Sequence, residues 1–288
     1  MRILWQSFVD RARNAPYFER LSAYLNEIAA PGTKVELRGT SPPDRDFGRL
    51  TEFRCAALAI DSALAAEDEG FDVFVFGHFQ DPGLYEARSA LRIPVVGVGE
   101  ATLHLAAQLG RRIGLVSIDP VFAVWHLEQA ERYGLRDRVV GVAGMGAIPE
   151  DFSAAFAGDG AALARLKAAF MAGAEPLVAL GADVIVPAGV LPGLLLAREK
   201  GLAVGHAPVV NCASVGLKAA EMVAQLHVLD GLQPSRGPSF ALAPPRARAD
   251  FRALLAEGRA RDGAGVPSTP SGASGWHVGH ETMTVDGP

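Results

Sequence analysis

The stretch FDVFVFGHFQDPGLYEARSALRIP, residues 71–94, decides the fold of this chain. It opens with the uninterrupted apolar run 73–76, which is typical of a strand buried on both faces of a parallel sheet. Helical spacing of apolar residues begins after Asp81-Pro82, and aspartate before proline is a favourable helix start. His78 therefore lies where a buried strand ends and a helix begins, the edge at which open α/β sheets bind ligands. The alternative is a histidine that only fills a loop.

The chain repeats its pattern of strands and helices once. The first copy of three strand motifs reads RILWQS (2–7), DVFV (72–75) and PVVGV (94–98). The second copy reads RIGLVS (112–117), DVIV (183–186) and PVVNC (208–212). Such a repeat predicts an α/β fold of two similar lobes related by a pseudo-two-fold axis. Each lobe is expected to be a short parallel sheet flanked by helices, with the site in the cleft between them.

Domain boundaries follow from the repeat and from a change in composition after Gly231. We expect lobe 1 to comprise residues 1–98 and 208–228, and lobe 2 to comprise residues 99–207. Residues 229–288 are expected to form a Pro/Gly/Ser-rich extension with a short charged helix at 246–261. Such a composition does not bury enough apolar surface to order itself alone, and His277 and His280 within it are expected to be solvated.

Composition excludes several classes of function. The 288 residues are 49% hydrophobic and carry a net charge of −5 without a basic cluster, which argues against nucleic acid as a partner. The sequence has no apolar run long enough for a bilayer and no secretion signal before the strand MRILWQSF, so we expect no membrane partner and a cytoplasmic protein. Cys55 and Cys212 suit neither a disulfide framework nor a zinc site. We expect a small-molecule substrate, no metal or other cofactor, and a homo-oligomer.

The strand ends of both lobes supply the candidate site. From these ends we expect the residues Gln6, Ser7, His78, Phe79 and Gln80 of lobe 1 and Ser117, Asp119, Ala188, Gly189 and Val190 of lobe 2. Ser7 and Ser117 occupy matching positions, where they bind a substrate or only cap a strand end. Asp119, Glu100 and Asn211 are supporting candidates, and Glu100 has a helix-capping alternative. Cys212 ends a strand directed into the cleft, but Val98 at its repeat position favours an apolar filler.

Four stretches resemble the aspartate/glutamate/hydantoin racemase superfamily, nearest to its hydantoin racemase branch. They are GHFQDPGLYEAR (77–88), IPVVGVGEATLHLA (93–106), RYGL (132–135) and GADVIVPAGVLPGL (181–194). The resemblance covers residues 1–229 and implies two α/β lobes with a site between them. It also implies one cysteine at a strand end of each lobe, the two thiols acting as opposed acid/base groups on a carbon next to a carbonyl.

Both of those cysteine positions are replaced here. The first is His78, and the second falls on Ala188 or Gly189. Racemisation through two thiols is therefore not expected. A neutral imidazole is a competent general base near pH 7, so we expect His78 to serve a one-base proton transfer of isomerase, lyase or hydrolysis type. The expected substrate is a small carbonyl compound such as a carboxylate or a cyclic imide.

Two alternatives remain at this point. One is a pseudoenzyme that binds a small ligand without turnover. The other is a nicotinamide-dependent oxidoreductase, because GVGEAT (97–102) follows a strand, opens a helix and matches most of a dinucleotide fingerprint. Thr102 stands where the fingerprint has its third glycine, which weakens this second alternative.

Overall fold

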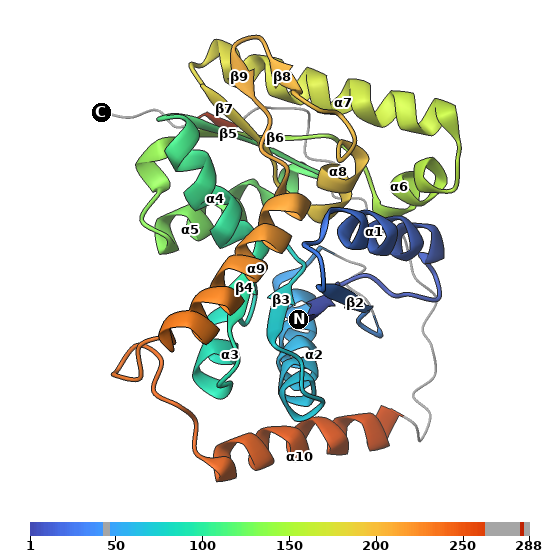
Figure 1. Cartoon of the computed structure of the whole chain (residues 1–288). Coiled ribbons are helices and arrows are strands. Elements are labelled where there is room, and N and C mark those ends of the chain that lie inside the picture. The colour runs from blue at the N-terminus through green and yellow to red at the C-terminus, as the bar shows by residue number, and fades with distance from the viewer. Residues whose placement is uncertain (43–46, 263–282, 285–288) are drawn as a thin grey trace.

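The computed structural model describes residues 1–42, 47–262 and 283–284 (Figure 1). The C-terminal extension expected from the sequence includes a Gly/Ser/Pro-rich stretch at 262–275. Apart from Asp262, this stretch is outside the described residues, as are His277 and His280.

Lobe 1 is built on a four-stranded, fully parallel sheet with the order β2-β1-β3-β4. Its strands are β1 (Arg2–Gln6), β2 (Lys34–Arg38), β3 (Val73–Phe76) and β4 (Val95–Gly97), and its helices include α1 (Ala15–Ile28), α2 (Arg49–Asp68) and α3 (Leu84–Ala90). All four residues of β3 are buried, as a strand covered on both faces requires.

Lobe 2 repeats this arrangement. Its sheet has the order β10-β6-β5-β7, in which β5 (Ile113–Ser117), β6 (Val139–Gly144) and β7 (Val184–Pro187) are parallel and β10 (Met283–Thr284) is antiparallel to β6. The order β6-β5-β7 matches β2-β1-β3, so the two-lobed parallel α/β fold predicted from the repeat is confirmed. The helices that follow β4 in the chain are α4 (Val98–Leu109), α5 (Ala123–Arg132), α6 (Pro149–Phe156), α7 (Gly160–Ala179), α8 (Val190–Leu195) and α9 (Cys212–Asp230).

The last strand of the repeat is shorter than the sequence predicts. Instead of a strand over 208–212, the chain forms a short hairpin of two strands with two residues each, β8 (Ala203–Val204) and β9 (Ala207–Pro208). A single parallel bridge then joins Val209 to Ile185 of β7. Helix α9 then crosses from lobe 2 to lobe 1 and packs against α4 of lobe 2 and against β3 and β4 of lobe 1 (Figure 1). Between β4 and α9 the backbone thus passes from lobe 1 to lobe 2 and back again.

A glycine permits the turn that carries His78. A Cβ atom on Gly77 would lie 2.0 Å from Nε1 of the buried Trp5 on the neighbouring strand β1. No real side chain is tolerated at such a distance. Gly77 therefore allows β3 to end tightly against β1, which fixes the starting point of the His78 loop.

Asp81 does not cap the helix that follows it, contrary to the sequence-based expectation. Its φ of 51° is in the left-handed region, and α3 begins only after Gly83, whose φ is 86°. The turn directs the carboxylate of Asp81 to the backbone N–H groups of Gly99 and Glu100, at 3.0 and 2.6 Å. Asp81 thus caps α4 in place of α3.

The C-terminal extension is held against lobe 1. Helix α10 (Pro245–Asp262) runs along the outside of that lobe (Figure 1), and its Arg248 and Arg252 form ion pairs with Glu67 and Asp68 at the end of α2. These contacts explain how a segment poor in apolar residues takes up a defined position. Among the described residues, no helix has both the length and the apolar character needed to cross a bilayer.

Candidate active site

A cavity of about 610 Å³, counting the part open to solvent, lies where the strand ends of the two sheets meet. Of the residues predicted from the sequence, eight line it: Ser7, His78, Phe79, Gln80, Ser117, Ala188, Gly189 and Val190. Further lining residues, which the sequence did not single out, include Phe8, Tyr17, Phe47, Ile118 and Phe122. The cavity is therefore largely apolar with a few polar groups, as small-molecule sites usually are.

His78 is held from two sides. Its ring stacks on that of Phe8, with the centroids 4.5 Å apart. Its Nε2 atom is buried, has no hydrogen-bond partner among the described residues and lies 3.6 Å from Oε1 of Glu52, whose side chain is 13% exposed. Because Nε2 is directed at this carboxylate, Nδ1 is the ring nitrogen available to a bound molecule.

Glu52 was missed by the sequence reasoning, although a signal for it exists. It lies in the first turn of α2, and a helix that follows a parallel strand begins at the carboxyl edge of the sheet. Acidic residues in such a first turn are therefore candidates for the same edge as His78.

Ser7 and Ser117 occupy matching positions but have different partners. The hydroxyl of Ser7 lies 3.3 Å from that of Tyr17 on α1, while Ser117 Oγ lies 3.1 Å from Nε2 of His126 on α5. Burial raises the pKa of Tyr17, and burial lowers the pKa of His126 to about 4. Both partner side chains are therefore neutral near pH 7, and neither carries a charge into the cavity wall.

A buried hydrogen-bond network connects His126 to the His78 loop. Nδ1 of His126 lies 3.3 Å from Oε1 of Gln129, and the amide nitrogen of Gln129 donates to the carbonyl oxygen of Phe79. The same nitrogen lies 3.3 Å from Asp81, which also accepts from the Tyr133 hydroxyl at 2.8 Å. Burial raises the pKa of Asp81 to about 7, although the Tyr133 hydroxyl and two backbone N–H groups act in the opposite direction. Helix α5 of lobe 2 thus supports the loop that carries His78 in lobe 1.

The lobes also meet at the mouth of the cavity. The rings of Phe47 and Phe122, which both line it, contact edge to face with centroids 4.9 Å apart. Beside them Arg49 of α2 contacts two residues of α5. Its guanidinium lies over the ring of Trp125, and one of its nitrogens donates to both carboxylate oxygens of Glu128. An aromatic contact and an ion pair therefore connect lobe 1 to lobe 2 at this point.

Comparison with known proteins decides the family. The family model described as Asp/Glu/hydantoin racemase matches residues 14–220. The chain belongs to the Asp/Glu/hydantoin racemase family. A curated relative, the hydantoin racemase of Pseudomonas sp. (strain NS671), is 34% identical over 83 residues, which are 29% of this chain and 33% of that protein. The match thus spans about a third of the relative's length.

Several solved structures have a similar fold. The allantoin racemase from Klebsiella pneumoniae superposes with a TM-score of 0.70 at 22% identity, covering 85% of this chain and 94% of that one. A variant of arylmalonate decarboxylase has a TM-score of 0.52 at 15% identity, covering 83% and 98% of the two chains. The maleate isomerase Iso from Pseudomonas putida S16 has a TM-score of 0.52 at 16% identity, covering 83% and 96%. At these identities the likeness shows the fold alone.

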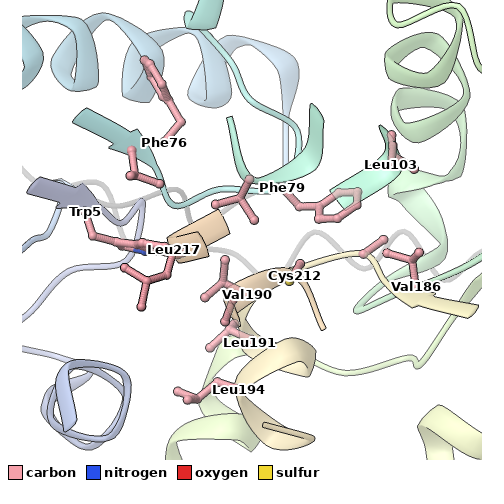
Figure 2. Packing of buried hydrophobic residues seen from close by; sticks show 14 of the residues in the cluster. Trp5, Phe76, Phe79, Leu103, Val186, Val190, Leu191, Leu194, Cys212 and Leu217 are labelled. Carbon is pink, nitrogen blue, oxygen red and sulfur yellow. The ribbon is translucent and has the colours of Figure 1, made fainter. Parts of the chain in front are cut away.

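Neither cysteine of this racemase-family chain lines the cavity. Cys212 is fully buried and belongs to the apolar cluster shown in Figure 2, and its thiol donates a hydrogen bond to the carbonyl oxygen of Gly189 at 3.1 Å. Burial raises its pKa to about 12. Cys212 thus lies outside the cavity wall, with its thiol bonded to the backbone of Gly189, as the apolar-filler alternative expects.

Gln6 is also absent from the cavity wall. Successive side chains of a strand point to opposite faces, so Gln6 faces away when Ser7 faces the cavity. Its amide nitrogen donates to the carbonyl oxygen of Gly39 and to the hydroxyl of Thr40. Gln6 therefore holds the loop after β2 and lies outside the cavity wall.

The three supporting candidates have structural roles outside the cavity. Asp119 accepts a hydrogen bond from the backbone N–H of Val121, and Asn211 caps α9 through Ala213. Glu100 forms a bidentate ion pair with Arg88. The sequence correctly placed them near strand ends, but their side chains are used by local capping and pairing.

The start of α4 leaves no place for a dinucleotide. A pyrophosphate in the GVGEAT turn would need the backbone N–H groups of Gly99 and Glu100. The buried carboxylate of Asp81 already accepts both. This arrangement disfavours the nicotinamide-dependent alternative.

Proposed function

We propose that this chain catalyses a one-base proton transfer on a small carbonyl compound, with His78 as the acid/base group. One observation carries the proposal: of the described residues that line the cavity, only His78 and Tyr17 are titratable. Burial keeps Tyr17 neutral. His78 is thus the one side chain among these lining residues of a type that commonly serves as a general acid or base.

The surroundings of His78 suit this role. In the proposed reaction Nδ1 removes a proton from the carbon next to the carbonyl, and the ring becomes an imidazolium. The carboxylate of Glu52, 3.6 Å from Nε2, stabilises that positive charge and keeps the hydrogen on Nε2 beforehand. The stacked ring of Phe8 holds the plane of the imidazole.

Lobe 2 supplies the other requirements. The first N–H groups of α8, at Val190 and Leu191, have no partner within that helix and border the cavity, where they donate hydrogen bonds to the carbonyl oxygen as it becomes negative. Ala188 and Gly189 line the same side and carry no proton-transfer group. The proton therefore returns to the face from which it left, which suits an isomerase, a lyase such as a decarboxylase, or hydrolysis by activated water.

Relatives in the family widen the choice of substrate. The solved structures with this fold include an allantoin racemase, an arylmalonate decarboxylase and a maleate isomerase. We propose a substrate of comparable size, either a carboxylate or a cyclic imide.

The test is turnover in D₂O with phenylmalonate, maleate and enantiomerically pure 5-benzylhydantoin, followed by ¹H NMR and polarimetry. We expect product, or deuterium at the carbon next to the carbonyl, without loss of optical rotation in the hydantoin. His78→Ala is expected to abolish the reaction, and Cys212→Ser, the matched control, to retain it. Rapid racemisation of the hydantoin would show that a second base exists. Binding of all three compounds without turnover would instead favour a non-catalytic ligand-binding protein.

A further inference from the structure

The orientation of the Gln129 side chain is fixed by a neighbour that only accepts hydrogen bonds. One end of its amide faces the backbone carbonyl oxygen of Phe79. A carbonyl oxygen carries no hydrogen, so the end that faces it is the NH₂ group. The amide oxygen of Gln129 must then face His126, at 3.3 Å from Nδ1.

That orientation fixes the tautomer of His126. The amide oxygen of Gln129 accepts hydrogen bonds only, so Nδ1 of His126 must carry the hydrogen. His126 is fully buried, and its lowered pKa keeps the ring neutral near pH 7. A neutral imidazole with hydrogen on Nδ1 has a lone pair on Nε2.

The tautomer in turn fixes the hydroxyl of Ser117. Ser117 Oγ lies 3.1 Å from Nε2 of His126, and a lone pair on Nε2 accepts the hydroxyl hydrogen. A serine hydroxyl has one hydrogen and two lone pairs. Since Ser117 lines the cavity, a bound molecule meets oxygen lone pairs there and no hydrogen.

The equivalent serine of lobe 1 is not restricted in this way. Ser7 Oγ accepts a hydrogen bond from the backbone N–H of Val9, and its other partner is the hydroxyl of Tyr17. A tyrosine hydroxyl both donates and accepts. The hydrogen between Ser7 and Tyr17 can therefore reverse to suit either kind of ligand.

We infer that Ser117 is a specificity-determining residue that accepts hydrogen bonds only, so that the bound molecule presents an N–H or O–H donor to lobe 2. A carboxylate at this position would place its lone pairs against those of Ser117, whereas the ring N–H of a cyclic imide would donate to them. The inference rests on the proposed function, because it assumes that the cavity holds the small carbonyl compound. Between the two substrate classes proposed above, it selects the imide.

The direction of the hydrogen bonds from Gln129 through His126 to Ser117 is tested first, and this test needs no substrate. In protein labelled with ¹⁵N-histidine, the His126 ring is identified by its failure to titrate between about pH 5.5 and 8 and by its loss in His126→Gln. We expect hydrogen on Nδ1 and an unprotonated Nε2. Hydrogen on Nε2 would reverse the Ser117 hydroxyl and overturn the inference, whatever the outcome for His78.

Ligand preference is tested by calorimetric titration with succinimide, N-methylsuccinimide and succinate. We expect the wild type to bind succinimide about 3- to 10-fold more tightly than the other two, the range of one net hydrogen bond. Ser117→Ala is expected to lose this preference, and Ser7→Ala, which removes the matching hydroxyl of lobe 1, to keep it. A wild type without the preference, or Ser117→Ala with it, would overturn the inference. These probes require no turnover, so failure here is distinguishable from failure of His78 as acid/base.

Discussion

Lobe 1 and lobe 2 share the order of three strands and carry a serine at the end of the matching strands β1 and β5, but the other side chains around their strand ends differ. At the end of β3, lobe 1 has His78 with Glu52 behind it, whereas at the end of β7 lobe 2 has Ala188 and Gly189. The partners of the two serines differ in the opposite sense: the histidine is now in lobe 2, where His126 contacts Ser117, and Ser7 of lobe 1 contacts Tyr17. The repeat thus fixes where side chains meet, and in the proposed reaction the identity of each side chain assigns the proton transfer to lobe 1 and the orientation of the substrate to lobe 2.

The largest expected effect comes from removing the base of lobe 1. His78→Ala should lower kcat/KM by ~10²–10⁴, the usual contribution of one positioned acid/base group. The fold should survive, because His78 is a partly exposed side chain at a strand end. The measurement is kcat/KM on whichever panel compound is turned over, with the melting temperature as a control. A loss of less than about threefold would mean that His78 is not the base.

The histidine of lobe 2 should make the fold sensitive to acid. The pKa of His126 is about 4 in the folded chain against 6.5 ordinarily, so between these values the unfolded chain binds the extra proton. The stabilisation is complete above about pH 6.5 and is lost as the pH falls towards 4, by up to about 3 kcal/mol. The pKa of Asp81, raised to about 7, contributes with the opposite sign. A comparison of wild type with His126→Gln therefore isolates the histidine.

Chemical unfolding at a series of pH values provides this measurement. The difference in unfolding free energy between wild type and His126→Gln should grow as the pH rises from about 4 to 6.5 and then level off. The matched control in lobe 1 is Tyr17→Phe, whose difference from wild type should not vary with pH in this range, because the pKa of Tyr17 is raised. A difference between wild type and His126→Gln that does not change with pH would show that His126 does not make the fold sensitive to acid.

Glu52 should matter less than His78, because it acts through that residue. Glu52→Gln removes the negative charge near Nε2 and should reduce kcat by about 10- to 100-fold, the range found for carboxylates that orient metal-bound histidines. KM should change little, since Glu52 is not among the residues that line the cavity. Steady-state kinetics separate the two parameters. A rise in KM with unchanged kcat would assign Glu52 to ligand binding.

Thiol reagents should have the smallest effect. Cys212 is fully buried, its pKa is raised to about 12, and the thiolate is the reactive form. Incubation of the folded protein with iodoacetamide should leave turnover unchanged, with intact mass as the readout of labelling. Inactivation that follows labelling of Cys212 would show that this thiol, and not His78 alone, takes part in the reaction.

The fold and half of the site could be predicted because both depend on local patterns. Apolar runs such as 73–76 mark buried strands, and parallel strands bring their carboxyl ends to one edge, so Ser7, His78 and Ser117 could be placed together. The repeat also supplied a useful warning, since Val98 at the position equivalent to Cys212 indicated an apolar filler.

The remaining features depend on rotation and long-range packing. Gln6 and Ser7 are neighbours in the sequence, but only the orientation of β1 decides which of them faces the cavity. Asp81 adopts a positive φ and caps α4 instead of its own helix, a choice that no local rule predicts for an Asp-Pro pair. Gln129 reaches the backbone of Phe79, 50 residues earlier in the chain, because α5 of lobe 2 packs against the His78 loop of lobe 1.

The contact between Arg49 and Trp125 gives the protein a built-in optical signal. Trp5 is sealed inside lobe 1, whereas Trp125 lies under a guanidinium 5.3 Å from its ring, beside the two phenylalanines at the mouth of the cavity. Indole emission changes when a neighbouring cation departs and water takes its place. With Trp276, outside the described residues, replaced by phenylalanine, the tryptophan fluorescence of the folded chain reports on the contact between its two lobes without any attached dye.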